Sequence, residues 1–405
     1  MDDTPTYTVT PAHPIYNIHF GLVCLSSLLF SASFNMLIPE LPAYLSSMGG
    51  AEYKGLIIAL FTLTAGISRP FSGKLTDTLG RVPVMAVGSI VCFICGFLYP
   101  VLATVSGFLL LRLFHGFSTG FKPTATAAYV ADIVPQSRWG EAMGIHGICF
   151  STGMALGPAI GSAITNWFSI NVLFYSSSAL ALLSIIILFN MKETVRHKNK
   201  FSFAMLKLTR HDIIDLPVLP AGIATLLGYI PYGVIVTVIP DWGAHLGISN
   251  KGLFFMVFTI ASLFIRFVAG RVSDSYGRVH VIRVGLLIVA LSLVVMGAYE
   301  SITGLMTGAV LFGIGGGIVS PAISAWTIDL ASPDQRGKAN ATMYIALEIG
   351  IGLGALLAGL FFKDVIAMIP PILYASAGAV LLALVYMFYW KHTPYSGQDV
   401  KQKLN

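Results

Sequence analysis

Twelve long apolar runs constrain the fold of this 405-residue chain more than any other feature. A helix needs about 20 apolar residues to cross the hydrocarbon core of a bilayer. These runs are too long and too uniformly apolar for the alternating strands of a membrane β-barrel. The sequence therefore predicts an all-α integral membrane protein with twelve transmembrane helices. The predicted spans are 16–38, 52–72, 84–104, 106–130, 140–164, 170–190, 214–238, 251–270, 281–299, 302–327, 339–362 and 366–390.

The composition argues against a large soluble protein. Charged residues make up 10% of the chain and hydrophobic residues 56%, whereas soluble proteins average about 25% charged residues. All four cysteines lie inside apolar runs, where packing explains them better than redox or zinc chemistry, so we predict no metal site. The segment 1–14 is polar and lacks the basic start of a signal peptide. We therefore expect the first apolar run to remain as a span.

The distribution of positive charge predicts the orientation, because cytoplasmic loops carry an excess of Lys and Arg. With both termini in the cytoplasm, 17 of the 24 Lys and Arg residues fall in cytoplasmic segments and 3 in outer segments. The other 4 lie within spans. The basic residues form no compact patch of the kind that binds nucleic acid. We expect a bacterial cytoplasmic membrane protein.

The longest internal polar stretch, 191–212, is interpreted as a cytoplasmic linker between two six-helix halves. Its basic residues either follow the general charge bias or bind lipid head groups. The predicted organisation is a cytoplasmic tail (1–14), a first bundle (15–190), the linker (191–212), a second bundle (213–390) and a cytoplasmic tail (391–405).

A constant offset of 197 residues relates the two halves, which indicates an internal duplication. Parallel repeats of six spans suit a carrier that rocks one half against the other. The matching pairs are Arg69/Arg266, Gly73/Gly270, Asp77/Asp274, Gly80/Gly277, Arg81/Arg278, Asp132/Asp329, Gly140/Gly337, Gly153/Gly350 and Gly157/Gly354.

The pattern G-x-L-x-D-x-x-G-R at 73–81, repeated as G-x-V-x-D-x-x-G-R at 270–278, resembles the signature loop of the major facilitator superfamily. The resemblance covers the whole chain. It implies two six-helix bundles with a substrate cavity between them.

We interpret the repeated loops as a latch on the cytoplasmic side. Asp77 could cap a helix and pair with Arg81. Such a network could hold the halves together in one state and release them in another, although a static clamp is the alternative. The predicted latch residues are Gly73, Asp77, Gly80, Arg81, Gly270, Asp274, Gly277, Arg278, Asp132 and Asp329.

The fifth span contains G-x-x-x-G-P-x-x-G, formed by Gly153, Gly157, Pro158 and Gly161. This pattern resembles the motif of exporters and antiporters in the superfamily. The second half has Ala355 in place of the proline, as in the twelve-span drug:proton antiporters. Glycines four apart also allow helices to approach closely, so ordinary packing is compatible with this interpretation.

Two further elements resemble those antiporters. The sequence from Arg112 to Gly116 resembles R-x-x-Q-G, with His115 where glutamine is usual. In relatives this arginine is tied to proton movement, so the resemblance assigns proton coupling to Arg112. His115 could exchange a proton near neutral pH or simply pack. In Pro39-Glu40-Leu41-Pro42, Glu40 is either a gate or proton residue or a surface residue.

Charged residues inside spans are costly and usually functional. Lys122 lies ten residues after Arg112, which is about 15 Å deeper and about 80° around the helix, so both could border one cavity. Lys122 then suggests a substrate with a negative group or a partner acid. Glu348, near the middle of its span, is predicted to face the cavity and carry a proton, with a structural hydrogen bond as the alternative. We expect Arg69 and Arg266 to be cytoplasmic anchors.

Several aromatic residues are predicted to line the cavity as well. They are Phe34, Tyr129, Tyr229, Tyr232, Trp326 and Tyr344.

The leading prediction is a monomeric transporter that exports a small organic molecule or drug in exchange for protons, by alternating access. The proton gradient supplies the energy, and no cofactor is expected. The alternatives are export of an anionic metabolite, siderophore or lipid-linked substrate, or uptake by symport. A membrane receptor or enzyme is disfavoured because the chain shows no Walker loop, H-E-x-x-H or G-x-S-x-G set in a soluble domain.

Overall fold

The computed structural model describes residues 17–135, 138–195, 201–202, 205, 214–332 and 336–390. Within these ranges the chain is helical, with thirteen α-helices of which twelve have 18 residues or more. They are α1 (Ile18–Asn35), α2 (Leu41–Ser47), α3 (Lys54–Thr78), α4 (Arg81–Leu98), α5 (Val105–Ile133), α6 (Trp139–Trp167), α7 (Ile170–Phe189), α9 (Leu219–His245), α10 (Leu253–Tyr276), α11 (Arg278–Ala298), α12 (Ile302–Leu330), α13 (Arg336–Phe362) and α14 (Ile369–Tyr389).

Each predicted span corresponds to one of the twelve long helices. In the described part of the chain, ten helices are long and apolar enough to cross a membrane. The other two are α5, which carries Arg112 and Lys122, and α10, whose apolar part is only Leu253–Arg266. The all-α membrane fold is confirmed, and α5 and α10 complete the two bundles by their position rather than by their hydropathy.

The signature segments expected as loops are largely helical. Residues 73–78 form the end of α3, and residues 270–276 form the end of α10. The turns themselves depend on Gly80 and Gly277, whose φ angles are +121° and +87°. Only glycine adopts such angles without a steric penalty, so these two positions let each chain reverse into the next helix.

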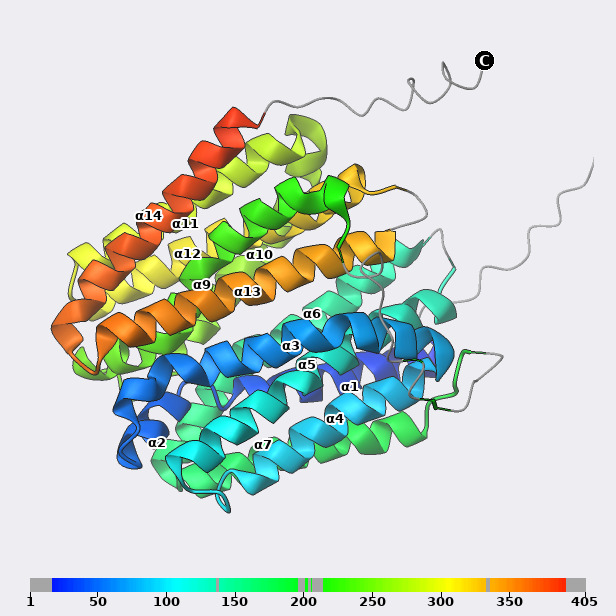
Figure 1. Ribbon diagram of the computed structural model, residues 1–405, viewed down its shortest axis with the longest axis horizontal. Coiled ribbons are helices and arrows are strands. Elements are labelled where there is room, and N and C mark those ends of the chain that lie inside the picture. Colours follow the sequence, from blue (N-terminus) through cyan, green and yellow to red (C-terminus); the bar gives the residue numbers. More distant parts are fainter. Residues whose placement is uncertain are drawn as a thin grey trace, which may run out of the picture.

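The long helices form two bundles that lie side by side (Figure 1), one made of α1 and α3–α7 and the other of α9–α14. Equivalent caps begin α5 and α12. Thr104 Oγ1 accepts a hydrogen bond from Gly107 N at 3.1 Å, and Ser301 Oγ accepts one from Gly304 N at 3.1 Å. The 197-residue repeat therefore extends to the helix caps.

We call the end of the bundles where α3 ends and α13 begins the linker end, and the opposite end the far end. The bundles touch along α3 with α13 and along α6 with α10. At the far end a Cβ on Gly55 would lie 2.5 Å from the Ala355 carbonyl oxygen, and one on Gly252 would lie 2.0 Å from that of Pro158. Glycine at these positions lets the two halves close against each other.

The exporter motif packs α6 against α1 within the first bundle. A Cβ on Gly153 would lie 2.4 Å from the Leu28 carbonyl oxygen, and one on Gly161 would lie 2.1 Å from that of Met36. A Cβ on Gly157 would lie 3.0 Å from the Ala32 carbonyl oxygen, which is also a close contact. The packing interpretation of this motif is therefore visible in the structure.

Candidate functional site

A cavity of about 1500 Å³ lies between the two bundles. Residues of both halves line it. Asp77 and Lys338 line the cavity at the linker end, where α3 ends and α13 begins. Ile58, in the first turns of α3, lines it toward the far end. The cavity therefore runs from the linker end deep into the membrane-spanning region.

Four of the six predicted aromatic residues line this cavity: Phe34, Tyr229, Tyr232 and Tyr344. Tyr129 and Trp326 do not, so their assignment to the cavity is wrong. Each is 1% exposed and packs inside its own bundle. A uniformly apolar helix gives no sequence signal for which face points inward, and the error follows from that.

One ion pair joins the two halves at the cavity wall. Arg69 Nη2 lies 2.8 Å from Glu348 Oε1, and the Arg69 guanidinium stacks 4.5 Å from the centroid of the Tyr344 ring. Arg69 comes from α3, whereas its two partners come from α13. The structure thus places Glu348 on the cavity wall. It also overturns the expectation that Arg69 is only an anchor at the cytoplasmic end.

Arg112 also lines the cavity, although its side chain is only 2% exposed. Its Nε donates to the Ile57 carbonyl oxygen at 2.9 Å, and its Nη1 lies 3.4 Å from the Tyr99 hydroxyl. The guanidinium stacks 4.5 Å from the Phe61 ring centroid. These contacts place the cation beside the cavity.

His115 lies behind Arg112, in the core of the first bundle. Its Nδ1 is 3.0 Å from the Tyr99 hydroxyl and its Nε2 is 3.3 Å from Cys92 Sγ. The ring is fully buried and is not part of the cavity lining. The packing interpretation of His115 fits this position, while its role in proton movement remains a prediction.

Lys122 does not border the cavity, so that prediction is wrong. Its Nζ donates to Ser26 Oγ and Ser89 Oγ, both at 2.8 Å, and to Ser184 Oγ. The rotation of about 80° from Arg112 turns Lys122 into the seam between α1, α4, α5 and α7. The amine therefore serves the interior of the first bundle rather than the substrate.

At the far end, two ion-pair clusters join the halves, each built around one buried charge, and we call them the far-end clusters. In one, Lys54 Nζ lies 2.9 Å from Asp241 Oδ2 and also pairs with Asp364. In the other, Lys251 Nζ lies 3.0 Å from Glu40 Oε2. Lys54 is 2% exposed and Glu40 is 4% exposed. Glu40 is therefore an interface residue, not a surface residue.

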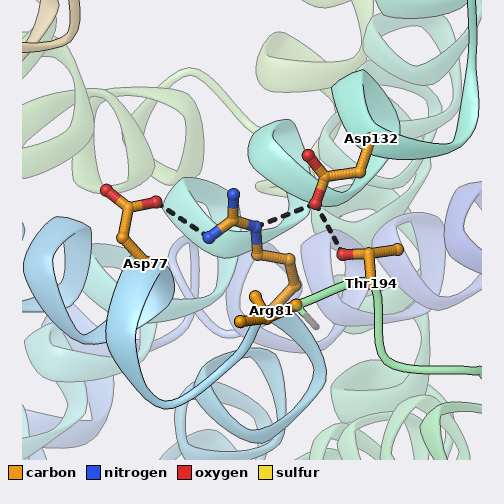
Figure 2. A pocket seen from close by; sticks show the side chains of 5 residues that line it. Asp77, Arg81, Asp132 and Thr194 are labelled. Atoms are coloured by element: carbon orange, nitrogen blue, oxygen red, sulfur yellow. Dashed lines mark hydrogen bonds and ion pairs between the residues drawn. The ribbon is translucent and has the colours of Figure 1, made fainter. Parts of the chain in front are cut away.

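Figure 2 shows the predicted latch in the first half, where Arg81 lies between two acids. Its Nη1 is 2.8 Å from Asp77 Oδ1 and its Nε is 3.0 Å from Asp132 Oδ2. Asp132 Oδ2 also accepts from Thr194 Oγ1 at 2.5 Å. All four residues belong to the first half or to the start of the linker, so this cluster does not cross between the bundles.

The second half repeats part of this arrangement. Arg278 Nε lies 3.1 Å from Asp329 Oδ2, which matches the Arg81–Asp132 pair at the offset of 197 residues. Asp274 lies in α10, but its side chain and the surroundings of Gly270 are outside the described part of the structure.

Glu193, which the sequence interpretation missed, caps α4 in place of Asp77. Its Oε1 accepts from Arg81 N at 3.0 Å and its Oε2 accepts from Val82 N at 3.1 Å. A Cβ on Gly80 would lie 2.3 Å from Glu193 Oε2, so a larger residue there would also displace the capping carboxylate. The expectation that Asp77 caps a helix is therefore wrong; Asp77 lies in the last turn of α3 and pairs with Arg81.

The residues missed by sequence reasoning share one property: their partners are distant in the chain. Lys54 and Lys251 are two of the three cations that the charge count assigns to outer segments, and Glu193 enters the sequence analysis only as part of the linker 191–212. A buried charge near a span end was the available signal for Lys54. Among the described residues, no group of three or more His, Cys, Asp or Glu is placed to hold a metal ion.

A cavity between two repeated helical bundles, with buried charges from both halves, defines a membrane transporter. The chain belongs to the Major Facilitator Superfamily, whose family model matches residues 23–219 and 221–404. The sequence-based recognition of this family is thus confirmed, and the chain is a transporter of small molecules.

The chain is 23% identical, over 365 residues, to an uncharacterised MFS-type transporter of Methanocaldococcus jannaschii, covering 86% of this chain and 92% of that one. It is 25% identical, over 338 residues, to a homologue of the multi-drug resistance efflux pump PmrA of Lactococcus lactis, covering 80% and 83%. Its fold is similar to that of a D-xylose–proton symporter, with a TM-score of 0.75, 17% identity, and coverage of 93% and 97%.

Proposed function

We propose that this transporter exports a small organic molecule from the cytoplasm in exchange for protons. The observation that carries the proposal is the Arg69–Glu348 pair, which joins the halves across a cavity that reaches the linker end. The resemblance of the fifth span to exporters and the similarity to a multidrug efflux pump both favour export.

The linker end is assigned to the cytoplasm because positive charge concentrates there. The far-end clusters and the glycine contacts close the opposite side. The structure then corresponds to an inward-open state, in which cargo enters from the cytoplasm. The two far-end clusters must separate before the cavity opens to the outside.

The ion pair supplies a physical basis for proton exchange. The Arg69 guanidinium lies 2.8 Å from Glu348 in the inward-open state, so the ionised carboxylate is more favoured there than in a state in which the pair is separated. Rocking of the bundles moves α3 relative to α13 and separates the pair. Glu348 then takes a proton from outside while the cargo leaves. On return to the inward-open state the pair re-forms and the proton is released into the cytoplasm.

The first test is a screen in inverted membrane vesicles with an imposed pH gradient, using ethidium, norfloxacin and 1-naphthoate as probes. Addition of a transported probe should release protons, detected with a pH-sensitive acridine dye. Probe accumulation that ignores the gradient would overturn proton coupling.

The second test is Glu348→Gln, which cannot exchange the proton. We expect gradient-driven accumulation to be lost, whereas exchange of labelled for unlabelled probe across the membrane continues. Glu141→Gln, which changes an exposed acid paired with Arg138, is the matched control and should behave like the wild type. Gradient-driven accumulation that persists in Glu348→Gln would remove this residue from the coupling step.

A further inference from the structure

We infer that the deep end of the cavity is a subsite for the carboxylate of an aromatic organic acid, with Arg112 as its ligand. This inference rests on the proposed function for the direction of transport and deepens it by naming the chemical class of the cargo. It stands on three observations: the depth of Arg112, its incomplete pairing and the apolar walls around it.

Arg112 lies deeper in the cavity than the Arg69–Glu348 pair. It is seven residues from the start of α5 at the far end, which is about 10 Å along the helix. Glu348 is twelve residues from the start of α13 at the linker end, about 18 Å along a helix of about 40 Å. A cargo entering from the linker end would therefore pass Glu348 before it reaches Arg112.

Among the residues that the structure describes, the buried Arg112 guanidinium has no counter-charge. It donates to one backbone carbonyl and to one hydroxyl, and its Nη2 has no acceptor among the described residues. No described carboxylate lies within ion-pairing distance of it. A buried cation in this situation is costly unless an anion completes its pairing. The planar guanidinium fork matches a carboxylate or a phosphate, and a carboxylate carries the single negative charge that one guanidinium balances.

The cation is also held in place for binding. The Ile57 carbonyl and the Phe61 ring contact its base and face, and Tyr99 links it to His115 in the bundle core. These contacts keep the guanidinium from turning toward the acids at the cavity mouth. A ligand that meets a fixed guanidinium loses less free energy to ordering. Tyr99 and His115 are thus positioning residues for Arg112.

The walls next to Arg112 favour an apolar, flat body for the ligand. Phe34 and Phe61 line the cavity with their ring centroids 6.2 Å apart, and Phe150 lies 6.4 Å from Phe34. Ile58 lines the same region. Rings of this kind pack against an aromatic ligand by offset or edge contacts. An aromatic body with one carboxylate satisfies both the walls and the cation.

The charge of the whole cavity lining points in the same direction. Among the described residues that line the cavity, five are Lys or Arg and two are Asp or Glu. A cleft with an excess of one sign raises the local concentration of ligands of the opposite sign. The cations are Arg69, Lys74, Arg112, Arg266 and Lys338, and the acids are Asp77 and Glu348.

The test is a binding measurement on the purified full chain in lipid nanodiscs. Three acid and amide pairs serve as probes: 1-naphthoate and 1-naphthamide, indole-3-acetate and indole-3-acetamide, and salicylate and salicylamide. For at least one pair, the wild type should bind the acid about tenfold more tightly than the amide, as expected for a charge-assisted hydrogen bond. A wild type that prefers no acid over its amide would overturn the inference.

Arg112→Gln should abolish that preference, and Arg112→Lys should keep part of it. Arg138→Gln, which removes an arginine exposed at the surface, is the control and should leave the preference unchanged. If Arg112→Gln does not yield monodisperse protein, Tyr99→Phe loosens the cation without removing it and should reduce the preference several-fold. An unchanged preference in the variants that fold would refute the role of Arg112.

The binding assay needs no pH gradient, so the two proposals fail separately. A preference for acids together with gradient-independent transport would overturn proton coupling and support the subsite. Proton-coupled transport of probes without any preference for acids would support proton coupling and overturn the subsite.

Discussion

The two halves share one architecture but differ in what they bury. At equivalent positions of α5 and α12, the first half has Arg112, His115 and Lys122, and the second half has Ala309, Phe312 and Val319. The neighbouring glycines confirm the equivalence. A Cβ on Gly88 would lie 2.7 Å from Lys122 Cβ, and one on Gly285 would lie 2.6 Å from Val319 Cγ2.

The difference extends to the surrounding helices. In α4 and the turn after it, Ser89, Cys92 and Tyr99 contact the buried cations or His115. Their equivalents in α11 are Leu286, Val289 and Met296, which join the apolar core. Buried polar networks cost free energy unless every member is paired. At these equivalent positions the core is polar in the first half and apolar in the second, so the first half places a hydrogen-bonded cation beside the cavity, while the second half contributes Glu348 to the cavity wall.

The largest change in stability is expected when a polar residue of one core is exchanged for the apolar residue at the equivalent position of the other. Val319→Lys places an amine where the equivalents of the three serines are apolar, so it should destabilise the protein by on the order of 3–5 kcal/mol. These equivalents are Ile223, Leu286 and Leu381. Lys122→Met removes an amine that has three serine partners, of which Ser26 and Ser184 also bond to each other, and should cost about 1–3 kcal/mol. Thermal unfolding in detergent compares them, and equal losses would mean that the cores do not differ in this way.

The next effect concerns the two cations of the far-end clusters, one from each half. Lys54 pairs with two acids and is 2% exposed, whereas the Lys251 side chain is 22% exposed and pairs with Glu40. Lys54→Gln should open the far end more than Lys251→Gln, because it leaves two acids without a cation. We expect Lys54→Gln to raise the rate at which a residue inside the cavity is labelled from outside on the order of tenfold, and Lys251→Gln to raise it a few-fold.

The measurement is the rate at which an impermeant maleimide labels Ile58→Cys from outside, in a background with Cys149→Ser. The prediction holds if Lys54→Gln is labelled faster than Lys251→Gln. Labelling that is unchanged in Lys54→Gln, or faster in Lys251→Gln, would show that these clusters do not hold the far end closed.

The smallest effect on stability is expected for the latch in the first half. Asp77 is 73% exposed, so Asp77→Asn should change stability by less than about 1 kcal/mol. Transport should nevertheless fall, because Arg81 loses a partner that closure of the linker end would use. Glu141→Gln, another exposed partner of an arginine, is the control. Normal transport by Asp77→Asn would exclude the latch and leave the static clamp as the interpretation of this cluster.

The helices were predictable because their signals are local. Hydrophobic run length predicted α1 and α14 within a few residues, and the Pro158 motif predicted where α6 packs closely. The ends of helices were less predictable. α9 continues to His245, seven residues past the predicted span, and the segment 73–78 is helical. Polar residues can extend a helix beyond the membrane, which hydropathy does not detect.

The candidate site was predictable only in part. Arg112 and Glu348 were identified because buried charges are rare in spans, and both line the cavity. Lys122 was identified by the same rule and lies elsewhere. The rule detects that a charge is buried, but it does not say what surrounds it. Arg69 was underestimated because its partner is 279 residues away in the chain.

The sequence by itself determined the membrane class, the duplication and the family, because run length, charge distribution and a fixed offset are properties of the chain. Only the tertiary structure decided which buried charges meet. On one helix, a rotation of about 80° separates Arg112 at the cavity from Lys122 in a seam of serines. Whether such a charge faces cargo, a neighbour or a counter-ion depends on helix packing, and no single helix carries that information.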